Sequence, residues 1–426
     1  MLHSQFGLLS RRRFFPLFLT QFLGAFNDNL FKNALVILIT FKLATAAGLN
    51  ASLMVTAAAG IFILPFFLFS ATAGQLADKY DKAWLIRRVK LAEIGLMVGA
   101  AAGFYWQNIY FLVTVLFLMG AQSSFFGPLK YGILPDHLAP DELISGNGLI
   151  QAATFLAILL GTLTGGLLIL STFGTTIISL GVIVVAVAGW VASRFIPGTA
   201  PAAPDIPIPA NFLGETLAIV RYTAVRAEIF FPILGVSWFW LVGATFLAQV
   251  PTFGKAVLGG GEDLVTLLLL AFSVGIGIGS LLCNRLLRGE VHGTFVPLGA
   301  LGISVFSVDL YLASVGWSGY ASQTVTVSLF LQAWQGWRII LDMLLIAVSG
   351  GVFIVPLNAM VQARSETFHR ARNIAAVNIL NALFMVVSAL VSMLFLASGY
   401  TVPELFLAVA MANIGVIFIT LKRRRE

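Results

Sequence analysis

The stretch Thr20-Gln21-Phe22-Leu23-Gly24-Ala25-Phe26-Asn27-Asp28-Asn29-Leu30-Phe31-Lys32-Asn33 places charged and amide side chains inside an apolar run that extends from residue 14 to residue 41. A run of this length predicts a membrane-spanning helix, because about 20 apolar residues cross the hydrocarbon core of a bilayer. A charge at that depth must face protein or water and marks a functional site. Asp28 and Lys32 are four residues apart and share one helix face. We therefore predict a polar site inside the membrane on the first helix, with Asn27, Asp28 and Lys32 as binding residues.

The composition indicates an integral membrane protein. Of the 426 residues, 59% are hydrophobic and only 10% are charged, whereas a soluble domain carries about 25% charged residues. The net charge of +7 comes from basic residues at predicted helix ends, so it indicates membrane topology and no nucleic-acid partner. One cysteine excludes an internal disulfide. The four histidines have no metal-ligand spacing, and we expect neither a metal nor a cofactor.

The hydropathy pattern predicts an all-α membrane protein with twelve spanning helices. We expect them at residues 14–42, 53–76, 84–104, 109–134, 143–170, 174–196, 228–253, 264–287, 294–314, 337–360, 372–396 and 402–421. Five prolines between residues 197 and 209 predict an extended linker, and residues 211–226 read as a short amphipathic segment. The predicted domains are an N-terminal six-helix bundle (1–196), a cytoplasmic linker (197–227) and a C-terminal six-helix bundle (228–426).

The two halves of the chain repeat each other. Phe14-Phe15-Pro16-Leu17 opens the first predicted helix and Phe230-Phe231-Pro232-Ile233 opens the seventh; Pro128-Leu129 and Pro356-Leu357 end the fourth and the tenth. Two parallel six-helix halves joined by a linker resemble the major facilitator fold, with two pseudo-symmetric bundles. Positive charge marks the cytoplasmic side, which places both termini there. The residues assigned to that side are Arg11 to Arg13, Lys79, Lys82, Arg87, Arg88, Lys90, Arg194, Arg221, Arg285, Arg288, Arg364, Arg370, Arg372 and Lys422 to Arg425.

The segment Gly74-Gln75-Leu76-Ala77-Asp78-Lys79-Tyr80-Asp81-Lys82 resembles the signature loop of the major facilitators. Its glycine permits a tight turn, and its aspartate is suited to cap a helix end and pair with a cation across it. Gly74, Asp78 and Lys79 are therefore candidate gating residues on the cytoplasmic side. Tyr80-Asp81 departs from the usual pattern, and a solvated charged loop is the alternative interpretation.

Further candidates lie on four other predicted helices. Lys130 is suited to bind a phosphate, or to extend toward the membrane interface. Asn147 and Gln151 on one helix, and Asn378 and Asn381 on another, form polar stripes at helical period that either bind substrate or pack helices together. Arg338 and Asp342 are four residues apart beside Trp334 and Trp337. Tryptophan is typical of the membrane interface, so this pair is a candidate outer gate.

Three segments resemble the bacterial lysophospholipid transporter family, a branch of the major facilitators: residues 21–29, 127–135 and 143–154. The resemblance implies flipping of lysophospholipids, such as lysophosphatidylethanolamine, from the outer to the inner leaflet of the bacterial inner membrane. There a separate or fused acyltransferase would re-acylate them. It also implies that Asp28, Lys130, Asn147 and Gln151 are headgroup or gating residues. Asp28 suits an ammonium group, and Lys32 or Lys130 suits a phosphate.

Two other functions compete with this one. In a proton-coupled exporter of drugs or small metabolites, Asp28 would carry the proton. An acyltransferase is disfavoured, because the chain has no soluble domain and its only related motif, from His137 to Asp141, is one residue short of His-x-x-x-x-Asp. We expect a monomer in contact with membrane lipids, and no enzyme activity.

Overall fold

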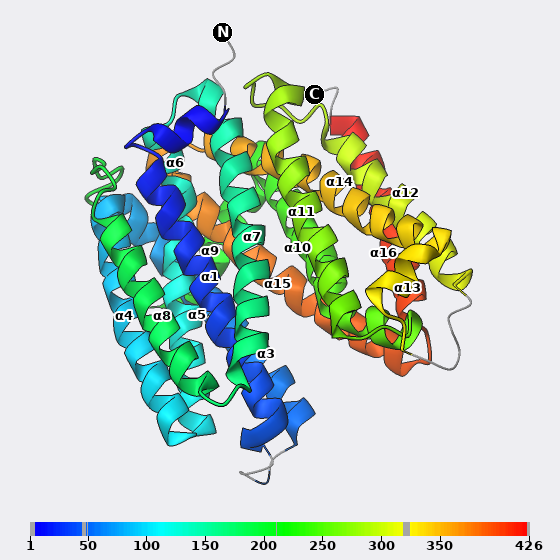
Figure 1. Ribbon diagram of the computed structural model, residues 1–426. Helices are drawn as coiled ribbons and strands as arrows, with labels where there is room; N and C mark the ends of the chain where they lie inside the picture. The colour runs from blue at the N-terminus through cyan, green and yellow to red at the C-terminus, as the bar shows by residue number, and fades with distance from the viewer. Residues whose placement is uncertain (1–4, 45–47, 49, 210, 318–323, 424–426) are drawn as a thin grey trace. The chain divides into compact units, whose positions relative to one another are not determined.

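The computed structural model describes residues 5–44, 48, 50–209, 211–317 and 324–423 (Figure 1). Within this part of the chain, 12 helices are long and apolar enough to span a membrane, which confirms the predicted all-α fold class. They are α1 (Phe15–Leu38), α3 (Ala51–Lys79), α4 (Lys82–Trp106), α5 (Ile109–Gly132), α7 (Leu143–Ile169), α8 (Gly174–Ser193), α10 (Ala227–Thr252), α11 (Glu262–Leu287), α12 (Val296–Val315), α14 (Trp334–Arg364), α15 (Arg370–Ala397) and α16 (Val402–Arg423). Arg424 and Arg425 of the C-terminal basic run lie outside the described residues.

Shorter elements connect or extend the spanning helices. The α-helical ones are α6 (Leu134–His137), α9 (Phe212–Ala224) and α13 (Val327–Gln332); the others are η1 (Gln5–Ser10), η2 (Ile39–Leu43), η3 (Pro140–Glu142), η4 (Phe253–Val257) and η5 (Thr367–His369). Polar residues cap the amino ends of several helices. The side chains of Asp81, Asn108 and Asn211 accept hydrogen bonds from first-turn amides of α4, α5 and α9, which satisfies donors that a helix cannot pair itself.

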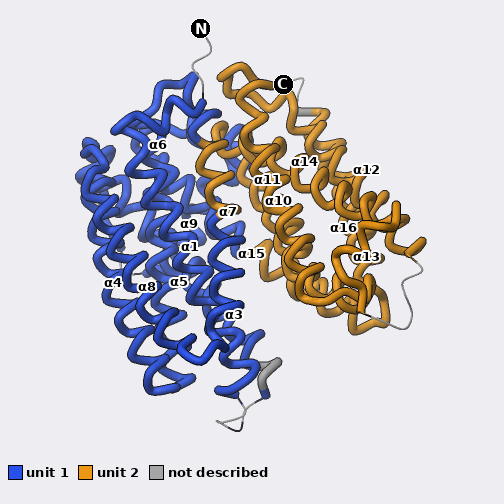
Figure 2. The backbone as a smooth tube through the Cα atoms, viewed as in Figure 1, with its two compact units in different colours: residues 1–146, 157–231, 361–382 blue, residues 147–156, 232–360, 383–426 orange. Residues whose placement is uncertain are grey.

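The chain forms two compact units, coloured in Figure 2. Unit 1 contains residues 1–146, 157–231 and 361–382; unit 2 contains residues 147–156, 232–360 and 383–426. Unit 1 therefore includes the last turn of α14 and the first half of α15, and unit 2 includes three turns of α7. The division of the sequence into halves around a linker at 197–227 stays a prediction.

Each unit has an apolar core between its helices. In unit 1, Phe31 of α1 meets Phe104 of α4 edge to face, with ring centroids 5.7 Å apart. Small residues bring α7 close to α1: a Cβ added at Gly161 would lie 2.5 Å from the carbonyl oxygen of Phe26. In unit 2, Phe246 of α10 stacks on Phe406 of α16 at 4.2 Å. Close backbone approach at small residues is a common way for membrane helices to associate.

The segment between the two halves of the sequence is anchored to the turn between α3 and α4. The amides of Ala202 and Ala203 donate to the carbonyl of Asp78, and Lys79 Nζ donates to the carbonyl of Ile206 at 2.8 Å. Helix α9 confirms the predicted short amphipathic segment. It lies along α3, where Gln75 Nε2 donates to Glu215 Oε2 at 2.5 Å.

Candidate functional site

A buried ion pair lies inside unit 1. Lys90 and Glu93 on α4 are one turn apart, their Nζ and Oε2 atoms are 2.6 Å apart, and their side chains are 1% and 2% exposed. Gly24 on α1 makes room for the ammonium group, because a Cβ there would collide with Nζ of Lys90. The ring of Phe126 on α5 lies 4.8 Å from the same nitrogen. Three helices therefore meet around one pair of charges.

Two amide side chains complete the surroundings of the Glu93 carboxylate. Asn27 Nδ2 on α1 donates to Oε1 at 3.0 Å, and Gln122 Nε2 on α5 donates to Oε2 at 3.1 Å. A buried ion pair is tolerated when further hydrogen bonds satisfy its remaining lone pairs and protons. The pair and its amides thus fix α1, α4 and α5 against one another beside Asp28.

Asp28 is half-buried and has a neutral partner. Its Oδ2 accepts a hydrogen bond of 2.7 Å from the Ser123 hydroxyl on α5. It interacts electrostatically with Glu93, Lys90 and Lys32, yet among the described residues it forms no ion pair. A carboxylate held by a hydroxyl keeps its charge available to a cationic ligand.

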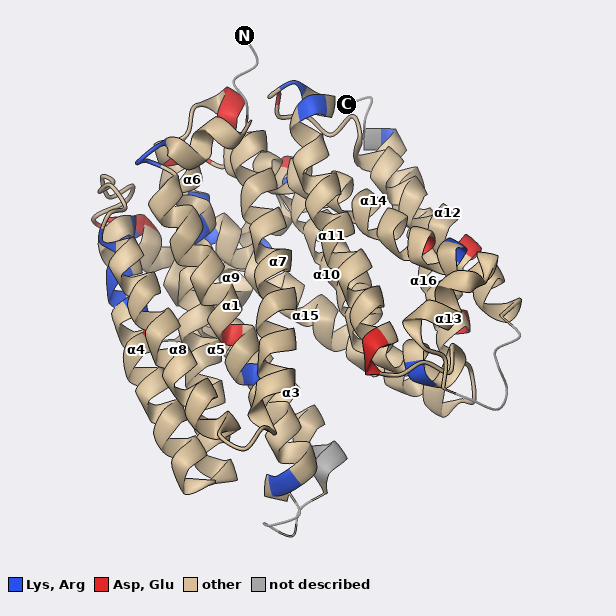
Figure 3. Cartoon of the chain, viewed as in Figure 1, with Lys and Arg blue, Asp and Glu red and all other residues tan. Residues whose placement is uncertain are grey.

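Two lysines of the site also lack a carboxylate partner among the described residues. Lys32 Nζ lies 5.1 Å from the centroid of the Phe62 ring, and Lys130 Nζ lies 4.9 Å from that of Tyr131. Both lysines interact electrostatically with Asp28. Aromatic faces attract cations, so the lysines are oriented without being neutralised. Unit 1 therefore contains one carboxylate and two ammonium groups that form no ion pair among the described residues. Figure 3 shows how few charged residues interrupt the otherwise uncharged helices.

The predicted amide stripes fall in both units. Asn378 on α15 belongs to unit 1, where its amide lies against Gly127 of α5, and its Nδ2 has no partner among the described residues. Asn381, one turn further, is half-buried. Asn147 and Gln151 on α7 belong to unit 2, and each is 1% exposed. The structure thus brings Asn378 into the unit that holds Asp28.

Asp78 of the signature segment binds the start of α15 within unit 1. Its carboxylate accepts from the amide of Ala371 at 3.0 Å and from Nε of Arg372 at 3.0 Å. Gly74 permits the contact, because a Cβ there would lie 2.8 Å from Cβ of Ala375. Lys79 instead binds the linker carbonyl of Ile206. The gating role of these residues stays a prediction.

A second carboxylate ties the same end of α15 to unit 1. Asp136 on α6 accepts from Lys82 Nζ at 3.0 Å and from Arg370 Nη1 at 3.2 Å. Lys82 is 2% exposed, so this ion pair is largely withdrawn from water. Asp78 and Asp136 together hold the first turn of α15 at two points.

We expect Asp78→Ala to loosen this end of α15. The substitution removes the cap and the ion pair with Arg372, and hydrogen bonds to charged groups contribute about 1.5–3 kcal/mol each. A reporter cysteine at buried Ile374, in a Cys283→Ser background, should therefore react with a maleimide roughly tenfold faster. Asp205→Ala removes an exposed linker carboxylate and is the matched control. Equal labelling rates in Asp78→Ala and the parent would show that Asp78 does not hold the start of α15 in place.

At the other candidate gate, the partner of Arg338 differs from the one expected. Arg338 on α14 pairs through Nε and Nη2 with the carboxylate of Asp309 on α12. Asp342 is 3% exposed, and its Oδ2 has no hydrogen-bond partner among the described residues. The guanidinium fork takes both oxygens of one carboxylate, and Asp309 on the neighbouring helix presents them. An outer gate at Arg338 and Asp342 stays a prediction.

Sequence reasoning missed Lys90, Glu93, Gln122 and Ser123. The charge pattern places Lys90 among the cytoplasmic basic residues, but the structure has it two turns inside α4 and buried. A charge this deep in a spanning helix indicates a paired site, and the spacing of Lys90 and Glu93 puts both on one face. That signal was present in the sequence.

The comparisons with known proteins agree with this architecture. The profile described as "Major Facilitator Superfamily" matches residues 17–331. Two proteins named lysophospholipid transporter LplT are each 30% identical to this chain. The one from Cronobacter sakazakii (strain ATCC BAA-894) aligns over 87% of this chain and 85% of its own length. The one from Escherichia coli (strain SE11) aligns over 84% of this chain and 82% of its own length. The crystal structure of the human organic anion transporter MFSD10 (TETRAN) superimposes with a TM-score of 0.75 at 15% identity, covering 96% of this chain and 99% of that one.

The described residues contain twelve helices able to span a membrane, and unit 1 holds a buried cluster of charges. These features define a multi-pass α-helical membrane protein, and the matches above place it among the transporters. The chain belongs to the Major Facilitator Superfamily and, within it, to the lysophospholipid transporter family. The two relatives and the one structural neighbour named above are transporters. The structural likeness, at 15% identity, concerns the fold alone.

Proposed function

We propose that the protein transports lysophospholipids across a bacterial inner membrane. The observation that carries the proposal is the cluster in unit 1, where the carboxylate of Asp28 interacts electrostatically with the ammonium groups of Lys32 and Lys130. None of the three groups forms an ion pair among the described residues. A zwitterionic headgroup bears a cation and an anion. Both charges find an oppositely charged partner at such a site.

The roles of the site residues follow from their chemistry. Asp28 binds the ammonium group of the headgroup, and Lys32 or Lys130 binds its phosphate through charge-assisted hydrogen bonds. The unpartnered Nδ2 of Asn378 donates to a phosphate or glycerol oxygen. Lys90, Glu93 and Gln122 hold the helices around Asp28 together, and Asn27, which donates to Glu93, stays a candidate binding residue beside Asp28. Asn147 and Gln151 in unit 2 and Asn381 in unit 1 stay candidate substrate-binding residues.

The direction of transport is from the outer to the inner leaflet, where a separate acyltransferase re-acylates the lipid. The excess of basic residues near one set of helix ends supports an orientation with both termini in the cytoplasm. The protein works as a monomer in this proposal, and Asp78 and Arg338 act in gates on opposite sides. The names of the relatives support the substrate class.

We expect the acyl chain to determine affinity. Each buried CH₂ contributes about 0.8 kcal/mol, so shortening the chain by two carbons at constant headgroup should weaken binding roughly tenfold. The measurement is competition against a labelled lysophosphatidylethanolamine by a series of chain lengths. An alkyl glucoside of matched chain length is the control for the tail alone. Equal binding of glycerophosphoethanolamine, which has no acyl chain, would contradict the lipid substrate.

The same vesicles distinguish the alternative function. A proton-coupled exporter of drugs or small metabolites would move a cationic dye against its gradient when a proton gradient is imposed, and would ignore lysophospholipid. Uptake of lysophospholipid that is insensitive to the dye supports our proposal.

A further inference from the structure

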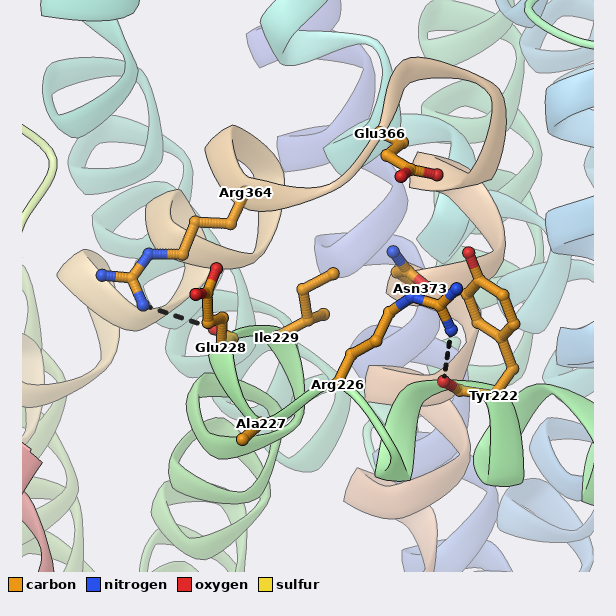
Figure 4. Close-up of a pocket in the computed structure, with 8 residues that line it drawn as sticks. All are labelled: Tyr222, Arg226, Ala227, Glu228, Ile229, Arg364, Glu366 and Asn373. Carbon is orange, nitrogen blue, oxygen red and sulfur yellow. Dashed lines mark hydrogen bonds between the residues drawn. The ribbon is translucent and has the colours of Figure 1, made fainter.

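A pocket of about 440 Å³ lies at the junction of α9, α10, α14 and α15, entirely within unit 1 (Figure 4). It is far along the chain from the cluster around Asp28 and shares no residue with it. Its wall consists of the end of α9, the first turn of α10, the end of α14 and the start of α15. The lining residues are Tyr222, Arg226, Ala227, Glu228, Ile229, Arg364, Glu366 and Asn373.

Four charged side chains of mixed sign line this pocket, and none forms an ion pair among the described residues. Arg226 lies over the Tyr222 ring, 3.6 Å from its centroid, and donates to the Tyr222 carbonyl at 3.0 Å. Arg364 donates to the carbonyl of Glu228 at 3.4 Å. Both guanidinium groups are thus positioned by neutral groups, which leaves their charges for an anion. Glu228 and Glu366 likewise keep their charges for a cation.

A buried acceptor at the pocket also lacks a donor. Asn373 is 1% exposed, and its Nδ2 donates to the Ser365 hydroxyl at 2.9 Å. Its Oδ1 has no partner in the described part of the chain. An unsatisfied buried acceptor costs about 1–3 kcal/mol, so this oxygen indicates a missing N–H or O–H donor. An ammonium group supplies one.

The anion side of the pocket is reinforced by a helix end. Ala227, Glu228 and Ile229 form the first turn of α10, a helix of 26 residues. The amino end of a helix carries partial positive charge and binds phosphate groups. Together, the helix end and the two arginines outweigh the negative charge of Glu228 on the same turn. They favour a phosphate beside an ammonium group that Glu366 and Asn373 accept.

The surroundings of the pocket are apolar. Val225, next to Arg226, is 80% exposed, and Leu213 and Leu217 of α9 are 62% and 58% exposed. An amphipathic helix with such a face lies in the membrane interface. A ligand bound by its headgroup in the pocket would therefore have lipid beside it for its tail.

We infer that this pocket binds the headgroup of a zwitterionic phospholipid of the inner leaflet, with the phosphate on Arg226 and Arg364 and the ammonium group on Glu366 and Asn373. The assignment to the inner leaflet rests on the proposed orientation. The binding itself does not depend on transport, since no residue of the Asp28 site takes part. A bound lipid would join α9 and the ends of α10, α14 and α15.

Native mass spectrometry of the purified full chain tests this inference. Delipidated protein is titrated with phosphatidylethanolamine or with phosphatidylglycerol of the same acyl chains. We expect the first lipid to bind at least tenfold more tightly in the wild type. Arg226→Gln with Arg364→Gln should remove that preference, whereas Glu366→Gln should shift it toward phosphatidylglycerol. Arg221→Gln, which removes an exposed arginine of α9 outside the pocket, is the matched control and should bind like the wild type.

Two further arms separate this inference from the proposed function. Asp28→Asn should keep the lipid preference even where transport is lost, so failure of either proposal is visible without the other. Soluble glycerophosphoethanolamine should compete only weakly; competition as strong as that of the lipid would make the soluble diester the ligand and overturn the lipid assignment. Equal binding of the two lipids to the wild type, or an unchanged preference in the double arginine variant that elutes as a monodisperse species, would overturn the site.

Discussion

Replacing Asp28 with asparagine should lower lysophospholipid flux roughly 100-fold and leave the helical fold intact. Asparagine preserves the shape of the side chain, and its amide oxygen still accepts from the Ser123 hydroxyl that binds Asp28 at 2.7 Å. It removes the negative charge that we assign to the ammonium group of the substrate. A hydrogen bond to a charged group contributes about 1.5–3 kcal/mol, and 2.8 kcal/mol corresponds to about 100-fold in binding.

The measurement is uptake of labelled lysophosphatidylethanolamine into vesicles that contain equal amounts of each variant. Asp205→Asn, which changes an exposed carboxylate of the linker, is the control for loss of one negative charge. Lys130→Gln should weaken binding of the same substrate, because it removes a positive charge that we assign to the phosphate. Wild-type flux in a monodisperse Asp28→Asn protein would disprove the binding role and favour a purely structural one.

The sequence alone predicts the architecture because membrane helices are determined by local composition. The lengths of the apolar runs identify all twelve spans found in the described residues. The division of the chain at the proline-rich segment stays a prediction. Asp28 can also be identified as a site residue from its own helix, since a charged residue in the middle of an apolar run is evident from the local sequence alone. These inferences depend on residues close together in the chain.

The rest of the site depends on contacts between distant segments. Glu93 becomes central only because Asn27 and Gln122, which lie 66 and 29 residues away, donate to it. Asp78 caps α15 through Ala371, 293 residues further along the chain. The pairing of Arg338 with Asp309 and not with Asp342 likewise depends on how α12 packs on α14. Helical periodicity indicates which residues share a face, but not which face of another helix they meet.

Breaking the Lys90–Glu93 ion pair should destabilise the protein by about 3–5 kcal/mol, because removal of one partner leaves the other charge buried without compensation. Lys90→Met leaves the charge of Glu93 buried with only the neutral amides of Asn27 and Gln122 as donors. Glu93→Gln leaves the charge of Lys90, which is 1% exposed, buried without a carboxylate. The free energy of unfolding, measured by denaturant titration of each variant in the same lipid, tests the expectation.

The double variant Lys90→Met with Glu93→Gln should recover much of the loss, since it removes both charges and keeps an amide for the neighbouring polar groups. Lys130→Met is the matched control: that lysine has no ion pair among the described residues, so its loss should cost less than about 1 kcal/mol. Single variants as stable as the wild type would show that the pair contributes nothing. A double variant less stable than both single variants would contradict the coupling. If the double variant is stable and still transports in part, Lys90 and Glu93 act by positioning Asp28. Asp28→Asn should reduce transport further, because it removes the group that contacts the headgroup.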